Sequence, residues 1–226
     1  MVHGVVSVVS KIKQVLQTEG LIPLLRRGFP FLLRYFLQYG TFYLYKHTLK
    51  ERIEADFMPR IQDFTLKVVS TNKQADQMSA NGFEDFRQQF INARRGLDKG
   101  AIAFCVYVGS ELAHIGWAAM SEEAKNTFDV LPYNVDFSDK EACTGGTVTI
   151  PKYRGKGLMT YGYFVRFQFL RQKGIVATRN AVNRKTIASQ KVMAKFSPKM
   201  YAKARYLKVL WWKFWRETQL IKTGKG

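Results

Sequence analysis

The stretch Thr149–Met159, with the sequence TIPKYRGKGLM, decides how this chain is organised. The β-prone run Ala142–Ile150 leads into it and predicts a strand. The pattern of Gly157–Lys173 predicts a helix, which Gly174 closes. The stretch is therefore a strand-to-helix turn, and the rest of the fold is expected to be built around it.

The turn has the composition of an anion site. Gly155 and Gly157 allow positive φ and a close approach to the backbone. The N–H groups of residues 155–159 precede or open the helix, so they lack helical partners and can converge on an anion at the positive end of the helix dipole. Arg154 and Lys156 add charge, so we expect a pyrophosphate to bind here. The spacing is neither a P-loop nor a dinucleotide fingerprint, and an ordinary strand-to-helix turn is the alternative.

Outward from the turn, the sequence predicts a mixed layout around one sheet. Further strands are expected at Phe64–Ser70, Ala101–Val108, Leu112–Met120, Ile175–Val182 and 200–215, and helices at 72–97, with an interruption at Asn81–Gly82, and at 184–196. Residues 121–141 are acidic and are expected to form a loop. This order predicts an α/β (α+β) fold in which helices flank a single sheet.

The N-terminal region differs from the rest in composition. Residues 6–39 are basic, aromatic and amphipathic, and they predict helices. Thr41–Thr48 is expected to be an edge strand, and residues 49–62 resemble a linker. We therefore expect an N-terminal extension, 1–61, followed by a compact domain, 62–226. The extension either packs on that domain or lies on an anionic membrane surface.

Charge is distributed unevenly along the 226 residues. The chain is 46% hydrophobic, which excludes a disordered chain, and it carries 36 Lys and Arg against 17 Asp and Glu. Residues 1–50 have a net charge of +6, residues 51–151 of −5 and residues 152–226 of +18. The basic C-terminal third predicts an anionic partner, for which nucleic acid, a membrane surface and a phosphate-bearing cofactor all qualify.

Several classes of protein are excluded by what the sequence lacks. Two cysteines, Cys105 and Cys143, cannot form a disulfide framework or a four-thiolate metal site, and the three histidines show no ligand spacing. We therefore expect no metal. The sequence contains no run of 18 uncharged apolar residues and no typical signal peptide, so a cytoplasmic location is expected, with peripheral attachment to the inner membrane face as an option.

The run PKYRGKGLMTYGYF, residues 151–164, resembles the acyl-CoA-binding turn of the GNAT (GCN5-related N-acetyltransferase) superfamily. The motif of that family is Arg/Gln-x-x-Gly-x-Gly/Ala. Arg154 and Gly157 fill its first two fixed positions, whereas Met159 stands where a small residue is usual. The resemblance covers roughly residues 62–215, and the predicted order of elements agrees with it.

The resemblance implies a mostly antiparallel sheet and an enzyme that moves an acetyl or other acyl group from acyl-CoA to an amine by direct attack. It implies that the strands before the turn and after the helix splay apart, and that the pantetheine arm bonds the backbone between them. The cofactor-binding residues implied are Val148, Thr149, Ile150, Arg154, Gly155, Lys156, Gly157, Leu158 and Met159. The acceptor, the acyl length and the oligomeric state are not specified.

The sequence departs from the family at the general acid. The place of the usual tyrosine is taken by Met193, so Tyr201 or Tyr206 would have to substitute for it, or the thiolate leaves unaided. For the general base, Glu141 is the first choice because it leads into the central strand. Glu122, Glu123 and His114 are the other candidates for the base, and Cys143 offers a covalent route.

Two other functions remain open at this stage. A non-catalytic basic module for nucleic acid would explain the charge of the C-terminal third, although the sequence contains no recognised nucleic-acid motif. A membrane-surface protein would explain the WWKFW run, residues 211–215, as an aromatic and cationic anchor. Packing of those aromatic side chains in the core is the alternative.

Overall fold

The computed structural model describes residues 37–220. The sequence predicts helices over residues 6–39. Residues 6–36 lie outside the described residues, so that part stays a prediction, whereas residues 37–39 are not helical and belong to the strand Leu37–Thr48. The chain forms two compact units. Within the described range, the larger unit comprises 42–204 and 217–220, and the smaller comprises 37–41 and 205–216.

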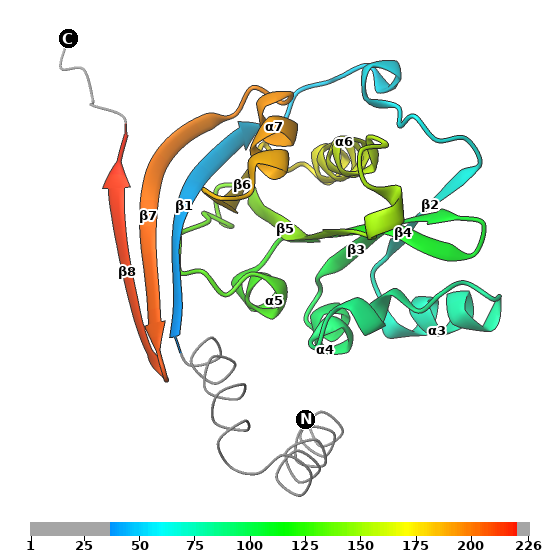
Figure 1. The fold of residues 1–226 in the computed structure, drawn as a ribbon, viewed down its shortest axis with the longest axis horizontal. Coiled ribbons are helices and arrows are strands. Elements are labelled where there is room, and N and C mark those ends of the chain that lie inside the picture. The colour runs from blue at the N-terminus through cyan, green and yellow to red at the C-terminus, as the bar shows by residue number, and fades with distance from the viewer. Residues whose placement is uncertain (1–36, 221–226) are drawn as a thin grey trace, which may run out of the picture. The chain divides into compact units, whose positions relative to one another are not determined.

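The fold is built on one sheet whose strands run in the order β2-β3-β4-β5-β6-β1-β7-β8 (Figure 1). The strands are β1 (Leu37–Thr48), β2 (Phe64–Val69), β3 (Ile102–Val108), β4 (Glu111–Ala119), β5 (Glu141–Thr149), β6 (Ala177–Asn183), β7 (Lys199–Val209) and β8 (Trp212–Gln219). The neighbours from β2 to β5 pair antiparallel, as do β6 and β1, whereas β5 and β6 are parallel.

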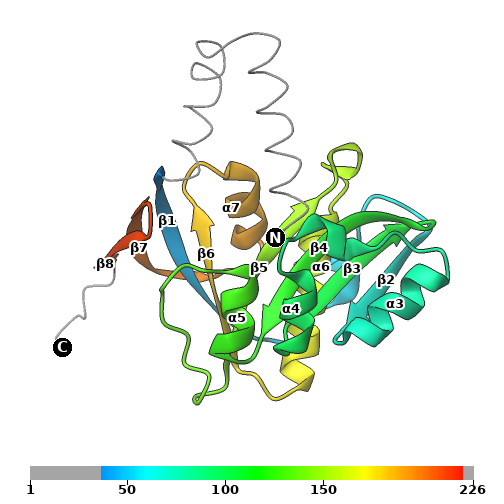
Figure 2. The same cartoon turned by 90° about the horizontal axis from the view of Figure 1, so that it is seen from below.

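Helices cover both faces of this sheet, as Figures 1 and 2 show. One face carries α6 (Leu158–Gln172) and α7 (Ile187–Ala194), and the other carries α3 (Asn72–Ala80), α4 (Ala93–Asp98) and α5 (Glu122–Phe128). Parallel neighbours such as β5 and β6 need a crossover connection, and α6 supplies it. The mixed α+β class expected from the sequence is confirmed.

Aromatic packing fixes α6 on its face of the sheet. The ring of Phe57 stacks on Phe164 of α6, with centroids 5.2 Å apart, and on Phe196 at 5.0 Å. Phe57 belongs to a short 3₁₀ turn, η1 (Glu54–Phe57), so part of the predicted linker at 49–62 is built into the core. The residues just before β2 are therefore anchored to the helix that opens at the predicted turn.

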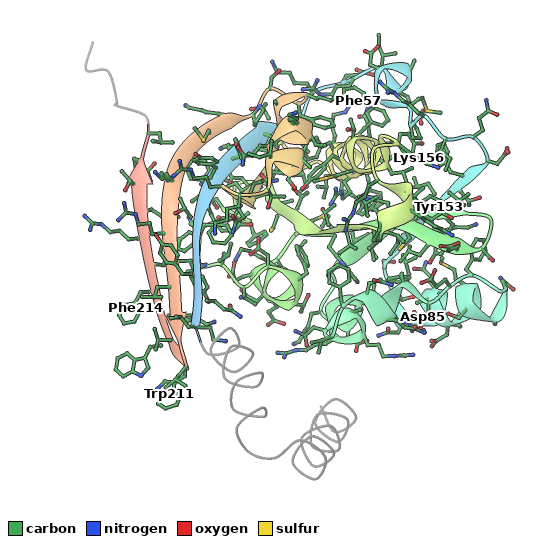
Figure 3. All side chains as sticks on the ribbon, viewed as in Figure 1. Phe57, Asp85, Tyr153, Lys156, Trp211 and Phe214 are labelled. Atoms are coloured by element: carbon green, nitrogen blue, oxygen red, sulfur yellow. The ribbon has the colours of Figure 1, made fainter. Side chains whose placement is uncertain are left out.

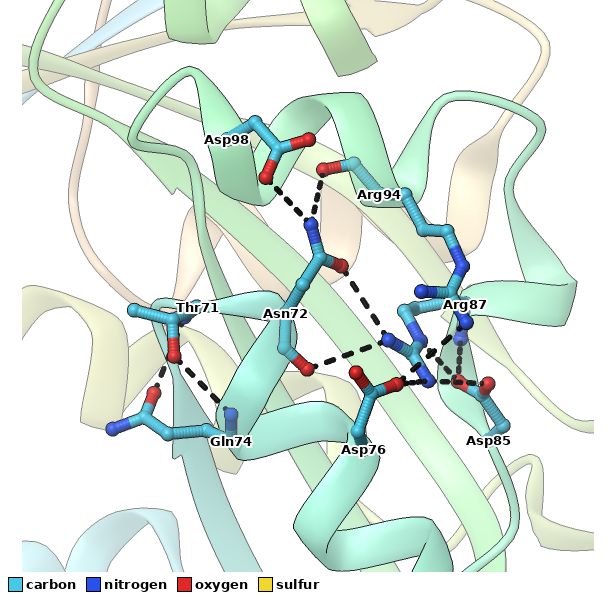
Figure 4. Close-up of polar contacts among 8 residues, drawn as sticks. All are labelled: Thr71, Asn72, Gln74, Asp76, Asp85, Arg87, Arg94 and Asp98. Atoms are coloured by element: carbon cyan, nitrogen blue, oxygen red, sulfur yellow. Dashed lines mark hydrogen bonds and ion pairs between the residues drawn. The ribbon is translucent and has the colours of Figure 1, made fainter.

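A buried arginine ties the segments of the opposite face together (Figure 4). Arg87, in the 3₁₀ turn η2 (Phe86–Gln89), pairs with Asp85 at 2.8 Å and with Asp76 of α3 at 2.7 Å. Asn72, at the start of α3, donates to Asp98 of α4 at 2.7 Å. These contacts order a stretch that is otherwise poor in apolar residues.

Three local predictions are wrong. The strand predicted at Thr41–Thr48 exists within β1, but it lies between β6 and β7 instead of at an edge. The predicted acidic loop contains α5, which the Ser121 side chain caps by accepting from the Ala124 N–H. The single strand predicted at 200–215 is a hairpin that turns at residues 210–211.

The domain boundary at residue 61 stays a proposal. Residues 42–48 of β1 pair with β6, so the sheet includes a strand from the proposed extension. The larger unit therefore includes this strand and the segment that carries Phe57, in addition to residues 62–204.

Candidate active site

The predicted anion turn links β5 to α6. After β5 the chain makes one 3₁₀ turn, η3 (Pro151–Tyr153), and Figure 3 shows Tyr153 and Lys156 on this connection. Gly155 and Gly157 then adopt φ of 77° and 85°. Both values lie in the left-handed region that glycine tolerates and other residues rarely adopt, so the sequence pattern has its expected backbone counterpart.

The segment before β2 holds the turn in place. The Lys156 carbonyl accepts a hydrogen bond from the Arg60 N–H at 2.8 Å. A Cβ at Gly157 would lie 3.3 Å from the Cα of Pro59, so the backbone leaves little room for a side chain there. A Cβ at Gly155, in contrast, would meet nothing within 4 Å. Positive φ therefore favours glycine at both positions, and crowding against Pro59 adds a second reason at Gly157.

The N–H groups of this turn are available to a ligand. Those of Gly155, Lys156 and Gly157 donate to no other described residue, and no described side chain caps α6. The N–H groups of Leu158 and Met159 belong to the first helical turn, which offers them no acceptor. Several convergent donors at a helix N-terminus form a site for a phosphate or pyrophosphate group.

Beside the turn, β5 and β6 diverge. They pair only at Glu141–Ala177, Ala142–Thr178 and Cys143–Arg179. Although β5 continues to Thr149 and β6 to Asn183, no further pair between them occurs in the described chain. The resemblance implied such a divergence, and the side chains of residues 145–150 are half-buried along it.

On its α6 side, the divergence is bordered by a buried arginine. Arg166 is completely buried, and its Nη1 lies 3.4 Å from the Gly145 carbonyl and 3.2 Å from Thr147 Oγ1. Its Nη2 has no hydrogen-bond partner among the described residues. A Cβ at Gly116 of β4 would lie 2.2 Å from Arg166 Nη1, so this glycine is what lets the guanidinium reach β5.

A tyrosine connects this arginine to β6. The Arg166 guanidinium stacks over the ring of Tyr163 at 3.9 Å. The Asn180 Nδ2 of β6 lies 3.5 Å from the Tyr163 hydroxyl and 3.1 Å from the sulfur of Met193. The Tyr163 hydroxyl therefore reaches the same amide as Met193, the residue that occupies the family's tyrosine place.

The carboxylate of Glu141 is fully engaged in ion pairs. It is buried and lies 2.6 Å from Lys46 and 2.5 Å from Arg179, and it also accepts from the Asp136 N–H at 3.0 Å. Burial alone would raise its pKa, but these donors outweigh burial and lower the pKa to about 2. A carboxylate with that pKa is a weak proton acceptor at neutral pH, so its catalytic role stays a prediction while its structural role is direct.

The other base candidates are also occupied. His114 is buried, with Nδ1 2.8 Å from Thr149 Oγ1, and burial lowers its pKa to about 3. Glu123 pairs with Lys99 at 2.8 Å, and Glu122 lies 3.6 Å from Lys125. Both glutamates are exposed on α5. This helix lies on the face of the sheet opposite α6, away from the α6 side of the divergence between β5 and β6.

Cys143 and the two alternative tyrosines have surroundings that do not favour the predicted chemistry. Burial raises the pKa of the Cys143 thiol, whose sulfur lies 3.2 Å from the Tyr133 hydroxyl, so thiolate is not favoured. The pKa of Tyr201 is raised by burial, with Arg179 5.1 Å from its ring. Tyr206 belongs to the smaller unit and packs against Trp215.

Sequence reasoning missed Tyr163, Arg166 and Asn180. A charged residue inside an apolar helix pattern, as at Arg166, was the available signal, because such a residue is rarely buried without a purpose. No comparable signal marked Tyr163 or Asn180, since both fit the ordinary composition of a helix and a strand.

The larger unit contains a second basic site, away from the turn. A hollow of about 360 Å³ is lined by Lys46, Thr48, Lys50, Arg52, Phe196, Ser197 and Lys199. Because its lining includes three lysines and one arginine, it is the alternative place for an anion and provides control residues for a binding experiment. No group of three or more His, Cys, Asp or Glu residues suited to a metal occurs in residues 37–220.

Comparison with known proteins supports the fold. No protein-family model and no curated protein matches the chain. Among solved structures, the GCN5-related glucosamine N-acetyltransferase region of a fungal multi-domain GH3 β-N-acetylglucosaminidase matches with a TM-score of 0.52 and 9% identity, over 84% of this chain and 23% of that one.

Two bacterial structures are similar at lower scores. A GNAT-family acetyltransferase from Colwellia psychrerythraea has a TM-score of 0.48 and 11% identity over 76% of this chain and 57% of its own. A functionally unknown protein from Staphylococcus epidermidis has a TM-score of 0.48 and 15% identity. The match covers 85% of this chain and 69% of the Staphylococcus chain. This chain thus spans little more than half of the Colwellia protein.

The chain has a GNAT-like fold. Identities of this size establish the architecture and leave the reaction to be argued from the site. Among the described residues, no helix is both long and apolar enough to cross a membrane.

Proposed function

We propose that the protein is an acyl-CoA-dependent N-acyltransferase, with acetyl-CoA or another acyl-CoA as cosubstrate and an amine as acceptor. The observation that carries this proposal is the turn at residues 155–159, whose two positive-φ glycines and free N–H groups open α6 beside the divergence of β5 and β6. The GNAT-like fold favours a transferase over a non-catalytic basic module.

Cofactor binding follows from the arrangement of backbone groups. The pyrophosphate would accept hydrogen bonds from the N–H groups of residues 155–159, with the side chains of Arg154 and Lys156 adding charge. The pantetheine arm would run along Val148, Thr149 and Ile150, where β5 has no partner from β6. This arm would bring the thioester toward Gly145, where Arg166 lies.

The chemistry requires a new C–N bond and the loss of the C–S bond. The amine attacks the thioester carbon and its nitrogen gives up one proton to water, negative charge develops on the carbonyl oxygen, and CoA leaves as a thiolate that takes up a proton. The buried positive charge of Arg166 would stabilise that developing charge. We assign the proton donor to Tyr163, because its hydroxyl meets Asn180 at the point where Met193 replaces the family's tyrosine.

The proposal is tested by calorimetric titration of CoA into the full chain. We expect saturable, micromolar binding that Gly157→Asp abolishes, because the aspartate adds both a side chain and a negative charge to the turn. Lys199→Gln, in the second basic hollow, is the matched control and should bind as the parent does. Equal loss in both variants, or none in Gly157→Asp, would reject the site.

Turnover is tested separately from binding. A panel of acyl-CoA thioesters ranked by thermal shift selects the donor, and mass spectrometry of products formed with cell extract identifies the acceptor. A protein that binds CoA but gives no acylated amine with any donor would refute the enzymatic part of the proposal.

A further inference from the structure

The smaller unit carries an apolar hairpin tip. β7 and β8 are joined by a two-residue turn, Leu210–Trp211. Figure 3 shows the side chains of Trp211 and Phe214 projecting from this end of the hairpin. Trp211 is 76% exposed, Trp212 61% and Phe214 54%, so the predicted alternative of core packing does not hold for these three side chains.

The turn itself has an unfavourable backbone for its residues. Two-residue hairpin turns normally place Asn-Gly or Gly-containing pairs at their centre, because these residues accept positive φ. Here Leu210 has a φ of 56°, which costs free energy for a branched apolar side chain. Strained positions that keep an unsuitable residue are typical of functional sites, and both turn residues present apolar surface.

Basic residues accompany the aromatic ones. A two-residue turn places Val209 opposite Trp212, and by alternation it places Tyr206 opposite Trp215, in agreement with their ring contact. The same count places Arg205 opposite Arg216, both exposed and on the face that carries Trp212 and Phe214. This outward face therefore has aromatic side chains at the tip and two guanidinium groups behind them.

We propose that this hairpin tip, residues 209–216, docks on the surface of an anionic lipid bilayer. Tryptophan and phenylalanine insert at the boundary between headgroups and acyl chains, and nearby arginine and lysine pair with anionic headgroups. Stable attachment without a lipid anchor needs both an apolar and an electrostatic contribution, and the hairpin supplies both.

Charge distinguishes a bilayer from a protein partner. Residues 205–216 contain Arg205, Lys208, Lys213 and Arg216 and no acidic residue. A second copy of the same hairpin would bring four cations against four, which disfavours self-association. Lysine is also depleted at protein interfaces, whereas a bilayer with anionic headgroups complements every charge here.

The test is flotation of the full chain with vesicles of phosphatidylcholine, with and without phosphatidylglycerol. We expect the parent to float with the anionic vesicles and to stay largely in the dense fraction with neutral ones. The variant Trp211→Ser/Trp212→Ser/Phe214→Ser should lower the partition constant by about tenfold or more. Ile91→Ser removes a fully exposed apolar side chain elsewhere and should float like the parent.

Two further variants protect the test against misfolding. Trp211→Ser alone changes only the turn. Arg205→Gln/Arg216→Gln removes two positive charges and leaves the apolar surface, so this double variant should lose binding specifically to anionic vesicles. Retained CoA binding shows that each variant is folded, and its result is independent of the flotation result.

The proposal is overturned if the parent never floats, or if the triple variant floats as well as the parent, which would assign attachment to another segment. It is also overturned if the parent ignores vesicles and the triple variant instead loses dimerisation or binding of single-stranded RNA. Those outcomes would assign the tip to a second copy or to nucleic acid.

Discussion

The ring of His114 in β4 lies against Gly162, the only glycine of α6. A Cβ at residue 162 would lie 2.6 Å from Nε2 of His114, and Nδ1 of the same ring lies 2.8 Å from Thr149 Oγ1 at the end of β5. One imidazole therefore sets the distance between the helix and the strand that flank the anion turn. The geometry of the candidate site depends on this contact.

Gly162→Ala is expected to destabilise the protein. In an isolated helix the change would stabilise by about 1 kcal/mol, but here the new methyl group meets the buried ring, and we expect a net loss of about 2 kcal/mol in the free energy of unfolding. Chemical denaturation measures it. In a double-mutant cycle with His114→Ala, the penalty of Gly162→Ala should shrink, and strictly additive penalties would contradict the steric explanation.

Buried neutral histidines predict acid sensitivity. Burial lowers the pKa of His47 to about 4 and of His114 to about 3, whereas both titrate near 6.5 in the unfolded chain. Below pH 6.5 the unfolded state binds the additional protons, so stability falls as the pH falls. We expect a loss of about 2 kcal/mol per histidine between pH 6.5 and pH 5.

Urea titrations at these two pH values check this expectation. His114→Gln should reduce the loss in the free energy of unfolding by the contribution of one histidine, about 2 kcal/mol. An unchanged pH dependence in that variant would show that folding does not lower the pKa of His114.

Tyr163→Phe separates proton donation from binding. The phenyl ring keeps the stacking on Arg166 and removes only the hydroxyl, so CoA affinity and the free energy of unfolding should change little. We expect the acyl-transfer rate constant to fall by about 10²-fold or more. Tyr201→Phe is the matched control from the earlier candidates. If Tyr201→Phe slows the reaction and Tyr163→Phe does not, the assignment of the acid is wrong.

Glu141→Gln tests the ion pairs at the end where β5 and β6 are still paired. The change leaves Lys46 and Arg179 without their carboxylate, and because both cations are partly exposed we expect a loss of about 2–3 kcal/mol. The lowered pKa of Glu141 contributes stability above about pH 4.5, and that stability is lost as the pH falls toward 2. The variant should therefore unfold with a shallower pH dependence in that range.

The catalytic hypothesis for Glu141 makes a different prediction. If Glu141 is the general base, Glu141→Gln abolishes transfer even under conditions where the variant is fully folded and binds CoA. A folded variant with transfer near that of the parent would leave only the structural role.

The local periodicity of the sequence predicted most elements correctly. The predicted strands Phe64–Ser70 and Ala101–Val108 differ from β2 and β3 by one residue at one end, and the predicted helix Gly157–Lys173 differs from α6 by one residue at each end. These segments bury one face or both, so the spacing of their apolar residues indicates whether each is a strand or a helix. The backbone of the turn before α6 was also predictable, because positive φ strongly favours glycine, whereas anion binding there stays a prediction.

Features that depend on distant segments were not predictable. The place of β1 between β6 and β7 follows from long-range pairing, which no local pattern encodes. The hairpin at 210–211 was missed because Leu-Trp is not a usual turn pair. The Tyr163–Asn180 contact joins a helix to a strand 17 residues away, so composition gave no indication of it.

The most direct test of the central claim is backbone hydrogen exchange measured with and without CoA. Five or more amides of the turn are proposed to bond the pyrophosphate, and each would exchange more slowly in the complex. We predict that protection is strongest in peptides covering Arg154–Met159 and Val148–Ile150. Protection concentrated instead around Lys46, Lys50 and Lys199, with the turn unchanged, would contradict the account.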